Sequence, residues 1–133
     1  KMKNLKTFIT ILALFIGITA FAQDKTKVIA LVTKANWCPT CKANGERMGK
    51  EVFSAYTTGD LKVVANDLTD DASKKTCKKA IQDAGVAKIA ESSNSTGIIT
   101  LIDAKTKKVI TTISVAKTTE EIKAAIDESL KKA

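Results

Sequence analysis

The 133-residue chain contains no histidine, one proline, one tryptophan and one tyrosine, and aromatic residues make up only 5% of it. Without histidine, the chain lacks the side chain that most often serves as a general base near neutral pH and as a metal ligand. With so few aromatic rings, a core must be built mainly from Ile, Val, Leu and Ala. Scattered lysines without rings to stack on bases argue against a nucleic-acid partner. The length fits one globular domain.

Cysteine is also scarce, and two of the three cysteines lie in residues 36–42, with the sequence Asn-Trp-Cys-Pro-Thr-Cys-Lys. The only proline, Pro39, follows Cys38 directly and suits the first position of a helix, where its missing N–H is no loss. Cys38 would then lie at a helix N-terminus, where the dipole and free N–H groups stabilise a thiolate. We expect Cys38 to attack a partner disulfide and Cys41, one helical turn on, to resolve the mixed disulfide.

Two other uses of this cysteine pair remain open. The first is a static structural disulfide. The second is a metal site, but two sulfurs without histidine or a second C-x-x-C make a poor zinc site, which takes four ligands. A Cu(I) site formed by Cys38, Cys41 and Met48 is only weakly indicated. We therefore expect neither a metal nor another cofactor.

Residues 1–22 are predicted to be a secretory signal peptide, with three lysines, an apolar run and a small-residue pattern that places cleavage after Ala22. The alternative is an uncleaved membrane anchor, but the apolar stretch falls short of the ~20 residues that a spanning helix needs. Export to the periplasm or secretion would favour a redox-active pair, because disulfides persist outside the cytosol. The lysines are Lys1, Lys3 and Lys6, and the apolar run spans residues 8–17.

The rest of the chain, residues 23–133, is predicted to form one domain with the element order β-α-β-α-β-β-α. Thr118 and Glu121 form a capping box that opens the last helix. Gly85 is a plausible stop for the second helix, and residues 86–97 either continue as a short helix or form a loop. The predicted strands are 28–33, 61–68, 98–102 and 109–115, the first helix runs from Pro39 to about Tyr56, and the second covers 72–84.

Cys77 shares a helix face with Ala80, Ile81 and Ala84, at helical spacing. This pattern predicts a buried, inert thiol. The alternative is a third redox-active or intermolecular thiol.

The element order and residues 35–42 resemble the thioredoxin fold, and in particular the Ala-x-Trp-Cys-x-x-Cys-Lys of exported thiol–disulfide proteins. The C-terminal periplasmic domain of the transmembrane disulfide interchange reductase is similar, also around residues 65–69. The resemblance implies an α/β, thioredoxin-like three-layer fold with a four-stranded mixed sheet flanked by helices. It also implies a redox disulfide between Cys38 and Cys41, surrounded by Trp37, Pro39, Thr40, Lys34, Thr96 and Gly97.

Four features depart from that family. Its cis-proline before the third strand is replaced by Thr96-Gly97 or Gly97-Ile98, and its buried aspartate by Val32. Lys34 replaces a common aromatic residue, and is either a cation that lowers the pKa of Cys38 or an ordinary surface lysine. The link from Gly85 to Gly97 is longer than usual, and we expect it beside the active site, where it would reshape the substrate groove.

The function predicted from these features is that of an exported thiol–disulfide oxidoreductase in cell redox homeostasis. Its partners would be protein thiols and disulfides, with a membrane disulfide reductase as a further partner. No nucleic acid is expected, contact with the membrane would involve only an uncleaved leader, and the chain would act as a monomer. The alternatives are a non-catalytic thioredoxin-like binding module, favoured by the missing proline and aspartate, and a Cu- or Zn-binding protein.

Overall fold

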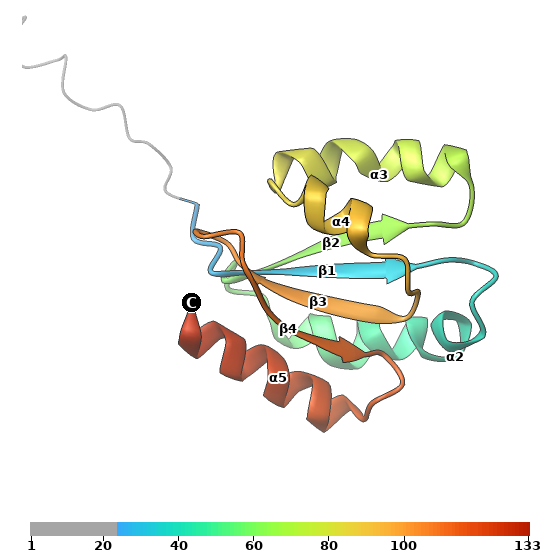
Figure 1. Ribbon diagram of the computed structural model, residues 1–133. Helices are drawn as coiled ribbons and strands as arrows, with labels where there is room; N and C mark the ends of the chain where they lie inside the picture. The colour runs from blue at the N-terminus through green and yellow to red at the C-terminus, as the bar shows by residue number, and fades with distance from the viewer. Residues whose placement is uncertain (1–23) are drawn as a thin grey trace, which may run out of the picture.

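The computed structural model describes residues 24–133, so the leader predicted for residues 1–22 lies outside the described residues. A four-stranded sheet is covered by helices on both faces (Figure 1). Within residues 24–133, no helix combines the length and the apolar character needed to cross a membrane. The strands are β1 (Val28–Lys34), β2 (Leu61–Asp67), β3 (Ile98–Asp103) and β4 (Val109–Ser114), and the α-helices are α2 (Pro39–Arg47), α3 (Asp71–Asp83), α4 (Ala87–Ser92) and α5 (Thr119–Lys132).

The sheet is mixed, with the strand order β2-β1-β3-β4. β1 and β2 are parallel, and β3 runs antiparallel to both β1 and β4. A parallel pair needs a crossover, which α2 provides, whereas β3 and β4 form a hairpin. The predicted fold class is confirmed.

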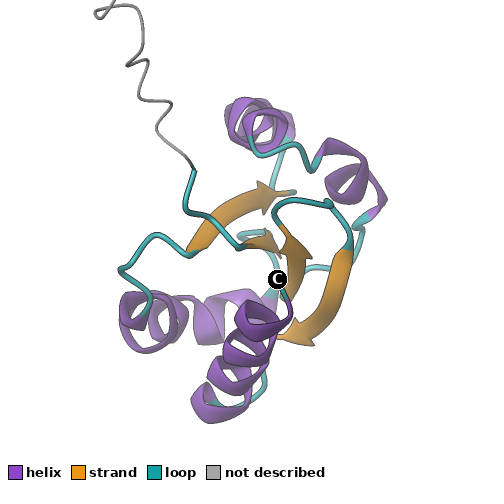
Figure 2. Ribbon diagram, turned by 90° about the vertical axis from the view of Figure 1, so that its left-hand side faces the viewer, coloured by secondary structure: helices purple, strands orange, loops and turns teal. Residues whose placement is uncertain are grey.

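β1 is the buried centre of the domain because side chains of a strand alternate between the two faces of a sheet. Val28 and Ala30 pack with α5 and the segment after α2, while Ile29 and Leu31 pack with α3 and α4. Figure 2, turned by 90°, shows the sheet between these two groups of helices. The apolar, largely β-branched run predicted as a central strand therefore contributes to two cores.

The helix after Cys38 is less regular than predicted. α2 ends at Arg47 and is followed by a π-helical segment, η2 (Met48–Val52), and a 3-10 turn, η3 (Phe53–Ala55). Met48 and Val52 are buried, as their spacing predicts. Gly45 and Gly49 weaken a regular helix at the point where its geometry changes.

The link from α3 to β3 contains both a helix and a loop. Gly85 adopts a φ of 73°, in the left-handed region that ends helices, so the predicted stop is confirmed. α4 follows, and residues 93–97 lead into β3. The Nδ2 group of Asn66, on β2, donates a 3.2 Å hydrogen bond to the carbonyl of Ala90 and so attaches α4 to the sheet.

Cys77 differs from its prediction, because it is partly exposed rather than buried. It packs at the margin of the core that contains Ile81, which is the one buried position among the described residues of α3. The apolar stripe of this helix is therefore too narrow to cover the thiol.

Replacing Ile126 with alanine should destabilise the domain by about 2–5 kcal/mol, because the substitution leaves a cavity in the core. Ile126 is 0% exposed, on the inner face of α5. The control is Val109→Ala on the edge strand β4, where the side chain is 47% exposed and the expected change is below about 1 kcal/mol. Urea unfolding measures both, and equal losses would contradict this description of the core.

Candidate functional site: a thiol pair at the start of α2

Cys38 caps the N-terminus of α2. Its backbone is extended, Pro39 occupies the first turn, and its Sγ accepts a 3.2 Å hydrogen bond from the backbone N–H of Cys41. Cys38 is 4% exposed, whereas Cys41 is half-buried. The first turn thus directs both the helix dipole and an N–H group at one sulfur, an arrangement that favours a thiolate.

The two thiols have opposite pKa shifts. Burial opposes ionisation of Cys38, but hydrogen bonds from Cys41, Thr96 and Thr40 outweigh it and hold its pKa below the ordinary value. Burial raises the pKa of Cys41, and the hydrogen bond to Cys38 and the charge of Cys38 add to the effect. Cys38 is therefore the thiol of the pair that ionises more readily, and Cys41 is the one that holds its proton more firmly.

Thr96 and Gly97 face the thiol pair from the loop before β3. The Thr96 side chain is among the groups that lower the pKa of Cys38. Gly97 has a φ of 76°, and its N–H donates a 2.7 Å hydrogen bond to the carbonyl of Thr33. The loop lies against α2, since a Cβ on Gly97 would be 3.4 Å from Cγ2 of Thr40, and glycine suits the position because of its positive φ. All peptide bonds of residues 24–133 are trans.

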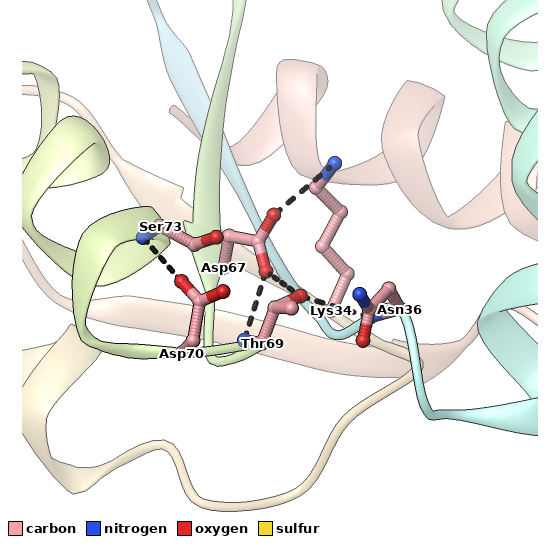
Figure 3. A network of polar contacts seen from close by, with 6 residues as sticks. All are labelled: Lys34, Asn36, Asp67, Thr69, Asp70 and Ser73. Carbon is pink, nitrogen blue, oxygen red and sulfur yellow. Dashed lines mark hydrogen bonds and ion pairs between the residues drawn. The ribbon is translucent and has the colours of Figure 1, made fainter.

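Lys34 belongs to a polar network beside the thiols (Figure 3). Its Nζ lies 3.7 Å from Oδ2 of Asp67, on the neighbouring strand β2. Burial opposes ionisation of Asp67, but hydrogen bonds from Thr69 and the charge of Lys34 outweigh it, so its pKa is lowered. The ion-pair partner of Lys34 is Asp67. The hydrogen bonds that lower the pKa of Cys38 come from other residues.

The same network holds the turn that precedes Cys38. The hydroxyl of Thr69 accepts a 2.9 Å hydrogen bond from the N–H of Asn36, and its carbonyl accepts one of 3.3 Å from Nε1 of Trp37. Asp70 caps α3 through a 2.7 Å bond from the N–H of Ser73. The indole of Trp37 is 58% exposed and lies on the surface beside the thiols.

A mainly apolar groove of about 420 Å³ lies on the α2 face of the sheet, next to Cys41. Val32 lines it at the position where the resemblance expects a buried aspartate. None of the described residues lining the groove carries a carboxylate, so the proton of Cys41 has no acid–base partner there. The lining residues are Val32, Thr33, Lys34, Cys41, Gly45, Met48, Gly49, Phe53, Val63, Ala65, Gly97 and Val115.

Comparison with known proteins gives a likeness of fold. No family model and no curated protein sequence matches the chain. Trxlp from Edwardsiella tarda EIB202 is 18% identical, with 80% of this chain and 89% of that chain covered and a TM-score of 0.50. A candidate protein disulfide isomerase from Bacteroides thetaiotaomicron is 21% identical, with 79% and 74% covered and a TM-score of 0.54. The fold is thioredoxin-like.

In this thioredoxin-like domain, one residue that the sequence did not single out holds the loop facing the thiols. The guanidinium of Arg47 donates to the carbonyls of Val115, at 2.7 Å, and Lys117, at 2.9 Å, and to Oγ1 of Thr119, at 2.9 Å. The N–H of Val115 donates in turn to the carbonyl of Gly97, at 2.9 Å. The available signal was that Arg47 is the only arginine in a lysine-rich chain.

The described residues bear on the metal alternative in two ways. Among residues 24–133, no group of three or more Cys, Asp or Glu side chains comes together in a way that could hold a metal ion. Met48 is buried in the core on the α2 face of the sheet.

In the reduced protein, alkylation of Cys38 by iodoacetamide should rise with pH through a midpoint below the value for a free cysteine, because only the thiolate reacts. Cys41 should react only at higher pH. Mass spectrometry of peptides alkylated for increasing times measures each site separately. Faster alkylation of Cys41 than of Cys38 would contradict the assignment.

Arg47→Lys should lower the free energy of unfolding by about 1–3 kcal/mol. A lysine ammonium cannot replace the planar guanidinium, whose N–H groups bond to the carbonyls of Val115 and Lys117 and to the Thr119 hydroxyl. It should also raise the midpoint of Cys38 alkylation, because the loop carrying Thr96 loses a support. Lys50→Met, at an exposed position of η2, is the control. An unchanged midpoint in the Arg47 variant would restrict Arg47 to stability.

Proposed function

We propose that the protein is a thiol–disulfide oxidoreductase that exchanges disulfides with protein partners through Cys38 and Cys41. The observation that carries the proposal is the pairing of a Cys38 thiol of lowered pKa with a Cys41 thiol of raised pKa, one helical turn apart. This division of labour is what a nucleophile and a resolving cysteine need. The thioredoxin-like fold is consistent with it.

In the reducing direction, the Cys38 thiolate attacks one sulfur of a partner disulfide. A bond forms between the two sulfurs, the partner's S–S bond breaks, and its second sulfur leaves as a thiolate that takes up a proton. Cys41 then loses its proton to water and attacks the sulfur of Cys38, which releases the partner's first sulfur as a thiolate. Two electrons reach the partner, and an external dithiol must reduce the Cys38–Cys41 disulfide again.

The residues around the thiol pair support this reaction by positioning the two sulfurs and the partner. Thr96 helps to lower the pKa of Cys38, and the positive φ of Gly97 lets the loop turn beside Thr40. Pro39 suits the first turn of α2, because an N–H group at that position would have no partner within the helix. The exposed indole of Trp37 offers a contact surface to partners.

The proposed setting is the periplasm or the outside of the cell, with a cleaved leader and a monomeric domain. The leader pattern and the persistence of disulfides outside the cytosol support it. A membrane disulfide reductase is the proposed source of the two electrons.

A second candidate function is a binding module without turnover. The groove beside Cys41 favours it, because no carboxylate among its lining residues can accept the Cys41 proton. Insulin reduction no faster than that by small thiols alone would support this second function.

Trapping with single cysteine variants tests the oxidoreductase. Cys41→Ser should accumulate mixed disulfides with partner proteins, because the resolving thiol is gone, whereas Cys38→Ser should accumulate few. Equilibration of the wild-type protein with a glutathione series gives the reduction potential and the favoured direction. A Cys38–Cys41 disulfide that dithiothreitol cannot reduce in the folded protein would rule out the proposed function.

A further inference from the structure

A second groove, of about 630 Å³, lies on the opposite face of the sheet from the one beside Cys41. One wall is α3, and the other is α4 with the start of the loop that follows it. The long link from Gly85 to Gly97 thus builds half of this groove. The lining residues are Asn66, Leu68, Lys74, Lys75, Lys78, Ile81, Gln82, Ala87, Ala90, Glu91, Ser93 and Asn94.

The α3 wall of this groove is positively charged. Lys78 lies three positions after Lys75 and four after Lys74, and all three line the groove from one side of the helix. Lys74 lies 3.8 Å from the fully exposed carboxylate of Asp71, a weak surface pair. In the described part of the chain, Lys75 and Lys78 belong to no ion pair. Glu91 is the single acid in the lining, so positive charge prevails.

The α3–α4 groove adjoins the segments that carry the thiol site. At one end, Leu68 donates a 2.8 Å bond to the carbonyl of Lys34 and is followed by Thr69, which holds Trp37. On the α4 wall, Ser93 and Asn94 lead along the chain to Thr96. In Figure 1 the loops after β1, β2 and α4 all gather at the end of the sheet where α2 begins.

Asn66 links the groove to the loop facing Cys38. It is 6% exposed, and its Nδ2 donates to the Ala90 carbonyl at 3.2 Å and to the Thr33 hydroxyl at 3.4 Å. The carbonyl of Thr33 accepts the 2.7 Å bond from Gly97. The groove wall and the active-site loop therefore rest on the same residue of β1.

We propose that the α3–α4 groove binds an acidic segment of the partner protein whose disulfide the thiol pair exchanges. The proposal rests on the proposed function and names the chemistry of its partners. Carboxylates of the segment lie against Lys75 and Lys78, and an apolar side chain packs on Ile81 and Ala90. A protein segment fits better than a nucleic acid, because none of the described residues lining the groove is aromatic and able to stack on a base.

Two synthetic peptides test whether the protein prefers partners with an acidic segment. Both contain one disulfide and the same apolar residue, and they differ only in flanking aspartates or flanking lysines. At low salt, the reduced protein should reduce the aspartate peptide at least about tenfold faster, and the difference should shrink at high salt. Equal rates for the two peptides would overturn the proposal.

Charge-reversal variants test whether the preference for the aspartate peptide comes from the lysines of the groove. Lys75→Glu combined with Lys78→Glu should remove or invert the preference. Lys105→Glu combined with Lys108→Glu changes the net charge equally on the exposed β3–β4 turn and should keep it. If both double variants lost the preference for the aspartate peptide equally, overall charge would explain it, and the proposed role of the groove would be overturned. Stronger binding of a single-stranded oligonucleotide than of the aspartate peptide, lost in the groove variant, would also overturn it.

Two further readouts separate this proposal from the function on which it rests. Hydroxyethyl disulfide is too small to fill the groove, so its reduction measures the thiol pair alone and should be unchanged in both double variants. Binding of a fluorescein-labelled aspartate peptide with serines in place of its cysteines measures the groove alone. Peptide binding without any disulfide reduction would overturn the oxidoreductase function and support the groove as a binding site. Reduction of the small disulfide without peptide binding would overturn the groove as a binding site.

Discussion

The hydrogen bond from the N–H of Gly97 to the carbonyl of Thr33, at 2.7 Å, joins the end of β1 to the loop that faces Cys38. The rest of the site depends on it, because it sets how closely Thr96 approaches the thiol. The register between β1 and β3 brings Thr33 opposite Ile98 and so puts Gly97 within reach. Glycine suits this point because its φ is positive, a backbone conformation that other residues rarely adopt.

Supports from both faces of the sheet meet at this contact. On the α2 face, Arg47 holds the carbonyl of Val115, whose N–H holds Gly97. On the α3 face, Asn66 bonds to Thr33 and to α4. A loop without proline to stiffen it is therefore fixed by polar bonds to well-packed neighbours, at a position where a small displacement would change the effect of Thr96 on the pKa of Cys38.

The surroundings of the thiols divide between the two faces of the sheet. The groove on the α2 face is apolar and keeps the Cys41 thiol protonated through burial. The groove on the α3 face is lined by lysines and by the additional helix α4. Lys34 pairs with Asp67 across β1 and β2, and the pKa of Cys38 is lowered by hydrogen bonds from other residues. The two grooves thus differ in chemical character, one apolar and the other positively charged.

The sequence by itself determined the element order, the thiol pair at a helix start, the stop at Gly85 and the capping box of Thr118 and Glu121, with Glu121 N to Thr118 Oγ1 at 3.1 Å. These features are local, because each depends on residues within one or two turns. Tertiary structure alone decided the pairing of Lys34 with Asp67, the partial exposure of Cys77 and the role of Arg47. Arg47 and Val115 are 68 positions apart and meet only after the sheet has set its register, so no local pattern could reveal that contact.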